Sequence, residues 1–308
     1  MNPSLGFVLV THNYTAQMLF LCEQLTGRFA RPPIAIHHDF SQTPLNTAVF
    51  PKNVTFVQDW LQTKWGKFPV VEGELRALRL LYKNSNPDWF VTLSGADYPV
   101  NSSDFILRDL YGHDEDAYLD HRRIQYSRFP VPKVWGKECF THPAWVTAAF
   151  HRYMAIGLGF SKLAALLGRI TVRDVYLRSD FFIEHLTPFR GNLFCYAGDQ
   201  WLTGNRKAAH ALLDDNEVNR KLAAHFRNRR NPDEAFYHTV LCNLQHLRVS
   251  ANSKRFSDWE GYTNHPRTLT EADFPRLLAS GAHFARKFAF QPEAFLNLNR
   301  MIDERAKV

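Results

Sequence analysis

Two adjacent acids open a predicted helix in the segment NPDEAFYHTVLCN, residues 231–243. Pro232 suits the first turn of a helix, and Asp233 and Glu234 complement the partial positive charge at that end. The rest of the segment is aromatic and aliphatic, so the acids stand out. Either they only start the helix, or Glu234 is also the carboxylate of a reactive site, which depends on the rest of the chain.

Strand-like and helix-like segments alternate along the first third of the chain. Apolar runs predict strands within residues 6–12, 33–39, 53–59 and 88–99, and helical periodicity predicts helices within residues 15–29 and 68–85. This alternation indicates an α/β fold with a parallel or mixed sheet covered by helices.

Polar residues follow three of these predicted strands, at His12, at residues 37–39 and at residues 94–97. In parallel sheets, ligands bind at the carboxyl ends of the strands. We therefore expect these residues to converge on one edge, where a nucleotide would bind. The alternative is that each polar group only caps a loop.

The common nucleotide-binding motifs are absent: the sequence has no P-loop and no G-x-G-x-x-G turn after a strand. It has one D-x-D string, Asp114 to Asp116, of the kind that holds a divalent metal in many sugar-nucleotide enzymes. The string precedes an apolar segment instead of ending a buried strand, which predicts an exposed turn. The nearby strand end offers one carboxylate, Asp97, too few for a good magnesium site. We predict no bound metal, with a site at Asp114 and Asp116 as the alternative.

Composition and charge set broad limits. A chain of 308 residues, 45% of them hydrophobic, suits one large α/β domain or two small ones. Its four cysteines are far apart, which predicts neither zinc nor a disulfide framework. The net charge of +7 fits an anionic small substrate or anionic lipid headgroups. The sharpest basic run, Arg227 to Arg230, lies in no nucleic-acid-binding module, so we expect no nucleic-acid partner.

The longest apolar stretch, residues 144–168, contains His151, Arg152 and Lys162. A membrane-spanning helix tolerates such charges poorly, so we expect a soluble helix or helix pair. Contact with a membrane surface is the alternative. The first predicted strand begins at Leu5, which leaves no room for a signal peptide, so we expect a cytoplasmic protein with possible peripheral contact at the inner face of the cell membrane.

Several longer segments occur in a characteristic order: AIHHDFS, KWGKFPVVEGELRALRLLYKNSNPDWFVTLSGADYPV, DEAFYHTVLCN, FSDWEGYTNHPRTLTEADF and HFARKFA. In this order they resemble the core-2/I-branching enzymes, which are β-1,6-N-acetylglucosaminyltransferases, and their relatives the peptide O-xylosyltransferases. The resemblance runs from Val8 to about Phe290, and the last three segments are closest to the xylosyltransferases.

The resemblance implies a GT-A fold, a Rossmann-like mixed sheet flanked by helices, in one domain over residues 1–308. The donor-binding part would take about residues 1–120, and the acceptor and catalytic part about residues 121–308. The implied reaction is an inverting transfer from a UDP-sugar, with no metal or other cofactor required. Inversion needs a carboxylate to deprotonate the acceptor hydroxyl, and Glu234 matches the family's catalytic base.

Cations are expected to meet the negative charge of the departing UDP. Lys287 matches the family's diphosphate-binding lysine, and Arg286 lies beside it. Arg267 stands where the N-acetylglucosaminyltransferases carry a second diphosphate cation. For each of these residues, a plain surface cation is the alternative.

Further residues carry over to the donor nucleotide. Val10 and Asp39 lie at the first two strand ends, Trp65 and Lys67 lie in one loop, and Asp97 follows the later strand. Asp39 would accept a hydrogen bond from the uracil or ribose, with a loop cap as the alternative. Trp65 is as compatible with a core position.

The segment AGDQWLT, residues 197–203, resembles the family's acceptor-side segment. Trp201 would stack on a sugar face, and Asp199 or Gln200 would bind sugar hydroxyls. The expected partners are therefore a UDP-sugar, carrying N-acetylglucosamine or xylose in first place, and a glycan or lipid-linked glycan acceptor. Two other classes stay open: a non-catalytic carbohydrate- or nucleotide-binding homologue, and a metal-dependent transferase that uses Asp114 and Asp116.

Overall fold

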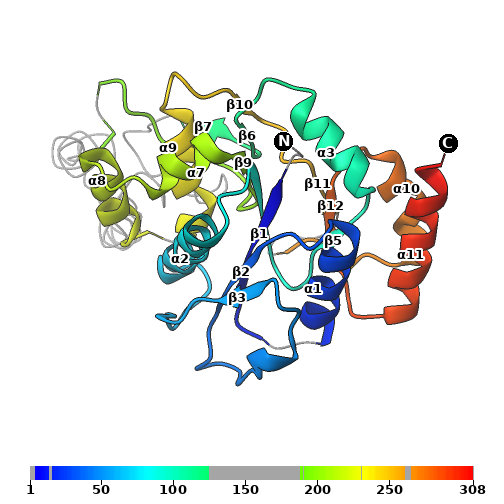
Figure 1. The fold of residues 1–308 in the computed structure, drawn as a ribbon. Helices are drawn as coiled ribbons and strands as arrows, with labels where there is room; N and C mark the ends of the chain where they lie inside the picture. Colours follow the sequence, from blue (N-terminus) through cyan, green and yellow to red (C-terminus); the bar gives the residue numbers. More distant parts are fainter. Residues whose placement is uncertain are drawn as a thin grey trace, which may run out of the picture.

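The protein is described by a computed structural model (Figure 1), which covers residues 4–13, 16–124, 188–189, 191–229, 231–260 and 265–307. A seven-stranded sheet has the order β10-β6-β9-β4-β1-β2-β3. These strands are β1 (Leu5–Thr11), β2 (Ile34–His38), β3 (Val54–Phe56), β4 (Trp89–Leu93), β6 (Ala117–Tyr118), β9 (Thr203–Asn205) and β10 (Val249–Ser250).

Strand direction fixes which residues share an edge of this sheet. β1 pairs in parallel with β2 and β4, and β2 pairs in parallel with β3. β9 runs antiparallel to both of its neighbours, β4 and β6, so β6 points the same way as β4. The carboxyl ends of β1, β2 and β4 therefore lie on one edge, as the polar strand ends predicted.

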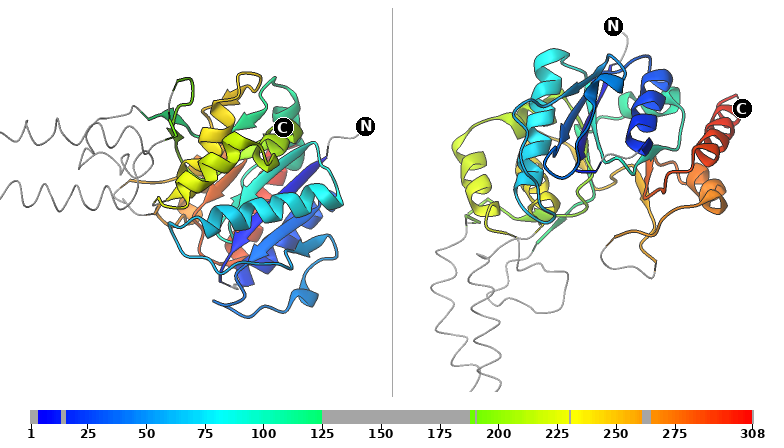
Figure 2. Two further views of the ribbon diagram at one scale, coloured as in Figure 1. Left: turned by 90° about the vertical axis from the view of Figure 1, so that its left-hand side faces the viewer. Right: turned by 90° about the horizontal axis from the view of Figure 1, so that it is seen from below.

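Helices cover both faces of the sheet (Figures 1 and 2). One face carries α2 (Pro69–Asn84), α7 (Arg206–Leu213), α8 (Glu217–Phe226) and α9 (Phe236–Cys242). The other face carries α1 (Ala16–Arg28), α3 (Ser103–Tyr111), α10 (Phe274–Ala279) and α11 (Pro292–Arg305). β1 alternates between the two cores, because Phe7 and Leu9 pack with the second group and Val8 with the first. The sequence-predicted α/β layering is confirmed.

A small sheet attaches the C-terminal segment to the edge where the strands end. It consists of β11 (Arg255–Ser257), β12 (Phe284–Arg286) and β5 (Tyr98–Pro99), with β12 in the middle. The amide of Phe288 donates to the carbonyl of Ala96 at 3.0 Å. Residues 284–288 are thereby held beside the turn that follows β4. A separate two-stranded pair joins β7 (Arg122–Arg123) to β8 (Tyr196–Ala197).

The helix predicted over residues 231–243 is divided in two. A 3-10 turn, η2 (Pro232–Glu234), precedes α9, and Ala235 between them has φ −142°. In a continuous helix the carbonyl of Glu234 would accept from the amide four residues later. Here it accepts from the amide of Gly198 at 3.0 Å, and the α-helical bonding begins with Ala235, whose carbonyl accepts from Thr239. The acids thus lie on a 3-10 turn that precedes the helix.

No helix in the described part of the chain is long and apolar enough to cross a membrane. The apolar stretch over residues 144–168, whose membrane contact the sequence left open, lies outside the described residues.

Candidate active site

Glu234 is partly buried and lies among other acids. Burial, together with the negative charges of Asp233 and Asp199, raises the pKa of its carboxyl group to about 7, and a hydrogen bond from Asn231 opposes the rise. Such a group exchanges its proton near neutral pH, which is the property that a general base needs. The catalytic role of Glu234 itself stays a prediction.

The turn that carries Glu234 is hydrogen-bonded to the loop that contains Trp65. Asn231 has a left-handed backbone (φ 48°), and its amide donates to the carbonyl of Gly66 at 3.1 Å. Gly66 is itself left-handed (φ 67°), and a Cβ atom there would lie 2.7 Å from Oδ1 of Asn231. Only glycine suits this position, since a side chain would be strained and would displace the turn.

Trp65 is 71% exposed, so the core position that the sequence left open for it is wrong. Lys67 is exposed as well. The structure brings both residues to the turn of Glu234, whereas their contact with the donor nucleotide stays a prediction.

Arg286 supplies positive charge close to these acids. Its Cζ lies 4.2 Å from the centre of the Trp201 ring, and its Nε lies 3.6 Å from Oδ1 of Asp97. None of the described residues accepts a hydrogen bond from its two Nη atoms, and the side chain is 18% exposed. Asp97 is fully buried, and its other oxygen accepts from the amide and hydroxyl of Ser94. Arg286 is therefore held in place, while the N–H donors on its two Nη atoms stay available to a ligand.

Trp201 is only 7% exposed, and Arg286 lies over one face of its ring. The ring thus supports Arg286. The stacking of Trp201 on an acceptor sugar stays a prediction. Since most of the ring is covered, a sugar could contact only its small exposed part.

Arg255 is a second guanidinium at this edge that the sequence did not indicate. It pairs in register with Phe284, and Ser257 pairs with Arg286, so both arginines lie on the same face of the small sheet. Its Nη2 donates to the carbonyl of Thr92 at 3.0 Å, and its Nε is buried without a partner among the described residues. Burial lowers the pKa of Arg255 to about 10, so it stays charged at neutral pH. The charge of Asp97 favours the protonated form of Arg255, although Asp97 pairs directly with Arg286.

Lys287 is exposed, and its Nζ forms no hydrogen bond or ion pair with a described residue. Its carbonyl accepts from the amide of Leu269 at 2.8 Å, which fixes the backbone of this residue next to Arg286. Lys287 is thus available to an anion, while the predicted diphosphate binding stays a prediction.

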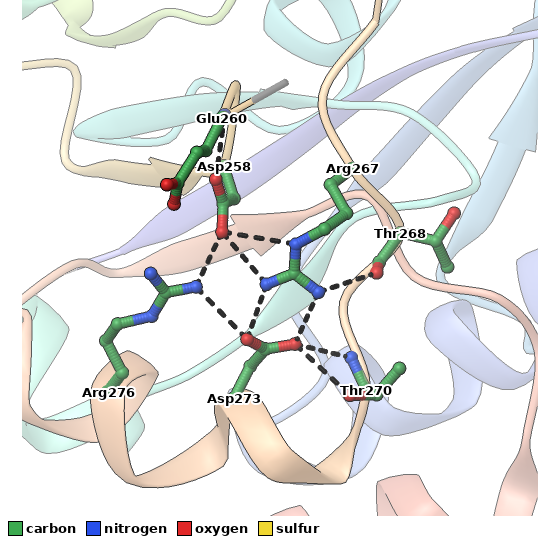
Figure 3. A network of polar contacts seen from close by, with 7 residues as sticks. All are labelled: Asp258, Glu260, Arg267, Thr268, Thr270, Asp273 and Arg276. Carbon is green, nitrogen blue, oxygen red and sulfur yellow. Dashed lines mark hydrogen bonds and ion pairs between the residues drawn. The ribbon is translucent and has the colours of Figure 1, made fainter. Parts of the chain in front are cut away.

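Arg267 lies in an ion-pair network (Figure 3). Its Nη2 lies 2.9 Å from Oδ2 of Asp258 and 2.6 Å from Oδ1 of Asp273, and Arg276 contacts the same two carboxylates. The guanidinium makes five hydrogen bonds, to Asp258, Asp273 and the carbonyl of Thr268. Since arginine has five N–H donors, none is left for a phosphate. The surroundings of Arg267 thus favour a structural role over the predicted diphosphate contact.

Val10 and Asp39 lie where the sequence placed them, at the ends of β1 and β2. Val10 pairs with His37, and the amide of Asp39 donates to the carbonyl of Thr11 at 2.9 Å. The buried carboxylate of Asp39 accepts five hydrogen bonds, from Ser41, Gln42 and Thr63. Burial opposes its ionisation, but these bonds together hold its pKa below the ordinary value. This arrangement is the loop cap that the sequence offered as the alternative to a nucleotide contact.

Asp199 and Gln200 lie on the loop that follows β8. The neutral imidazole of His238 donates from Nε2 to the carbonyl of Asp199 at 2.9 Å, and Nε2 of Gln200 donates to Oε2 of Glu74 at 3.1 Å. Burial raises the pKa of Asp199, and Asp120 raises it further. The structure brings both residues to Glu234, whereas their binding of acceptor hydroxyls stays a prediction.

Glu74 is a site residue that sequence reasoning missed. It is buried in α2 next to Val71, Ala77 and Leu78, at positions that form one apolar stripe. An acid inside such a stripe was the signal that could have revealed it, because acids are rarely buried without a reason.

The D-x-D string lies far from this site. Asp116 precedes β6, so it lies at the edge where the parallel strands begin, opposite the edge of Glu234 and Arg286. Asp116 is buried and accepts from Asn205, Lys207 and the amide of Arg248, so the prediction of an exposed turn is wrong for it. Asp114 is exposed and pairs with Arg248 at 3.1 Å. Neither acid faces the candidate active site.

Comparison with known proteins places this geometry in a family. The model of the "Branch: Core-2/I-Branching enzyme" family matches residues 5–129 and 168–278. Beta-glucuronosyltransferase GlcAT14B of Arabidopsis thaliana is 28% identical over 218 residues, which cover 68% of this chain and 42% of that protein. Xylosyltransferase sqv-6 of Caenorhabditis elegans is 22% identical over 266 residues, 78% of this chain and 28% of that protein.

The chain therefore spans less than half the length of these curated relatives. Both relatives are glycosyltransferases by name, and the mixed sheet between two helical layers is the GT-A-like arrangement that the sequence predicted. The family match covers most of the chain and includes the segments that carry Glu234 and Asp97. The protein belongs to the core-2/I-branching enzyme family of glycosyltransferases.

Proposed function

We propose that this protein is an inverting glycosyltransferase that moves a sugar from a UDP-sugar to a hydroxyl group of a glycan or lipid-linked glycan. The observation that carries this proposal is the position of Glu234. A carboxyl group with a pKa raised to about 7 lies on the same loop cluster as Arg286, whose guanidinium has free donors. Residues 197–201 link the two, because the amide of Gly198 donates to the carbonyl of Glu234 and Arg286 lies over the ring of Trp201. A base and an anion-binding group in one site are what a transfer from a diphosphate donor requires.

In the proposed step, Glu234 takes the proton of the acceptor hydroxyl as its oxygen forms a bond to the anomeric carbon. The bond from that carbon to the β-phosphate oxygen breaks, and its electron pair leaves with UDP. Arg286 and Lys287 would stabilise the negative charge that develops there, and Arg255 would add to the positive charge of the site. Cationic side chains in this role make a divalent metal unnecessary, so metal independence is part of the proposal.

The donor sugar is proposed from three candidates. UDP-xylose and UDP-glucuronic acid correspond to the names of the relatives, and UDP-N-acetylglucosamine corresponds to the wider resemblance of the sequence. A lipid-linked acceptor would bring the protein to the cytoplasmic membrane surface, which we include in the proposal. Sedimentation with anionic vesicles tests that part.

The test is turnover of a panel of these three donors by the wild type and by Glu234→Gln, together with UDP binding by calorimetry. Glu234→Gln should lower kcat by about a hundredfold or more while the affinity for UDP stays unchanged, because the base acts only in the transition state. Glu293→Gln, at an exposed position on α11, is the matched control. A Glu234→Gln variant with wild-type turnover would remove Glu234 from the role, and turnover of no donor together with tight UDP binding would favour a binding protein.

A further inference from the structure

Glu74 is a buried acid that the proposed reaction does not use. Its residue is 3% exposed, on the face of α2 that also buries Val71, Ala77 and Leu81. A carboxylate there loses its hydration, which is costly unless a cation or several donors compensate for it. No lysine, arginine or histidine of the described part of the chain lies within ion-pair distance of Glu74.

The groups that face Glu74 come from three elements. Asp233 faces it from η2, Tyr237 from α9, and Gln200 from the loop after β8. Gln200 donates to Oε2 at 3.1 Å. Oε1 of Glu74 and Oδ1 of Asp233 are buried, and neither forms a well-aligned hydrogen bond with a described residue. The hydroxyl of Tyr237 nevertheless lies close enough to Glu74 to lower the pKa of its carboxyl group. A buried carboxyl oxygen without a hydrogen-bond partner favours the protonated form, because a neutral carboxyl group loses much less free energy than a carboxylate when it is buried without donors.

The charges around Glu74 lead to the same conclusion. Burial, together with the charge of Asp233, raises its pKa to about 8, although hydrogen bonds with Gln200 and Tyr237 oppose the rise. At neutral pH the group therefore keeps its proton. Burial also raises the pKa of Asp233, to about 6. Three neighbouring acids, Glu74, Asp233 and Glu234, thus cannot all be ionised at neutral pH.

Gln200 connects Glu74 to the base. Its loop, residues 197–201, also contains Gly198, whose amide donates to the carbonyl of Glu234 at 3.0 Å. The same loop carries Asp199, whose carbonyl accepts from His238 at 2.9 Å. Glu74 is therefore hydrogen-bonded to this loop at Gln200, and Glu234 is hydrogen-bonded to it at Gly198.

We propose that Glu74 is a positioning residue, whose uncharged carboxyl group holds Gln200 and, through the 197–201 loop, keeps Glu234 in place for proton transfer. The proposal rests on the proposed function of Glu234 as the base. When Glu74 loses its proton, a negative charge forms between Asp233 and Tyr237 with no cation beside it. The loop must then open to water, and Glu234 loses its position.

The first test uses two substitutions with a matched control. Glu74→Gln keeps an acceptor for Gln200 and an N–H donor in place of the acid O–H. Its kcat should stay within about twofold of the wild type near pH 6.5, whereas Glu74→Ala should lose about tenfold or more in kcat with little change in UDP affinity. Glu72→Gln, on the same helix but partly exposed and paired with Arg76 and Arg227, should change neither value.

The pH dependence of kcat separates positioning from a merely structural role. The wild-type rate should fall as the pH rises past about 8, where Glu74 ionises, and this fall should be absent in Glu74→Gln. Identical alkaline profiles for the two proteins would overturn the proposal, as would a Glu74→Ala variant with full kcat.

A second readout needs no activity. Between pH 5 and pH 8 the folded wild type keeps a proton on Glu74 that the unfolded chain, with a pKa near 4.5, has lost. Wild-type stability should therefore fall with rising pH relative to Glu74→Gln, and the difference in melting temperature should level off above pH 8. If the two melting curves shift in parallel, Glu74 is ionised in the fold and the proposal is wrong. This result is independent of Glu234, so a failed Glu234→Gln test would be distinguishable from it.

Discussion

The guanidinium of Arg286 lies over the ring of Trp201, at 4.2 Å, while its Nε points to the buried carboxylate of Asp97 at 3.6 Å. An aromatic face and a carboxylate on two sides restrict the rotamers of Arg286, and the terminal Nη groups stay available. This relationship gives Arg286 a fixed position at the strand ends, where the nucleotide is expected.

Arg286→Ala should therefore weaken UDP binding by roughly 10- to 100-fold, the effect of losing hydrogen bonds to a charged group. Arg286→Lys should recover only part of the affinity, because an ammonium group keeps the charge but cannot stack flat on Trp201 or bind a phosphate with two parallel bonds. Calorimetric titration with UDP measures both. Arg300→Ala, at an exposed position on α11, is the control. Equal affinity for UDP in Arg286→Ala and Arg300→Ala would place the diphosphate elsewhere.

Lys287 and Arg267 should behave in opposite ways. Lys287→Ala should weaken UDP binding and slow transfer together without lowering the melting temperature, because its Nζ has no partner among the described residues. Arg267→Ala should lower the melting temperature, since it leaves Asp258 and Asp273 with Arg276 alone, while the UDP affinity of the folded protein stays unchanged.

Thermal melting and UDP titration of the same two preparations decide between these roles. Loss of UDP affinity in Arg267→Ala at an unchanged melting temperature would restore Arg267 to the diphosphate site.

The pH dependence of transfer should report the acids around Glu234. The carboxylate form is the base, so kcat should rise as the pH passes about 7. Asp199→Asn removes a nearby negative charge that raises the pKa of Glu234, and it should therefore shift this rise to lower pH. Initial rates from pH 5 to pH 9 measure the shift. A rise at the same pH in both proteins would mean that Asp199 is not charged when Glu234 titrates.

Asp116 should matter for stability and not for catalysis. Asp116→Asn should lower the free energy of unfolding by about 1–3 kcal/mol, because a buried acceptor of three hydrogen bonds loses its charge. Those bonds hold the pKa of Asp116 below the ordinary value of 3.8 despite burial. The stabilisation is therefore complete above that pH and is lost as the pH falls below it, so the difference between variant and wild type should shrink in acid.

Transfer activity should persist in excess EDTA, and Asp114→Asn, at an exposed position, serves as the control for Asp116→Asn. Activity that EDTA abolishes and manganese restores would contradict the metal-free mechanism.

The sequence by itself determined the α/β layering and the edge at which the strands end. Both depend on patterns within single elements, such as the apolar run of β1 and the helical stripe of α2, which any compact fold has to bury. It also pointed to Glu234, because an acid in an otherwise apolar segment stands out and because that segment resembles the family's catalytic helix, while the role of Glu234 as the base stays a prediction.

The tertiary structure decided which charged side chains are available to a ligand. Arg267 and Arg286 look alike in the sequence, but Arg267 contacts two carboxylates, whereas Arg286 contacts the ring of Trp201 and the carboxylate of Asp97. Asp116 accepts a hydrogen bond from Asn205, and Glu74 accepts one from Gln200. Both partners are far away along the chain. The charge state and availability of a side chain depend on partners that only chain folding brings near, and no local pattern in the sequence records them.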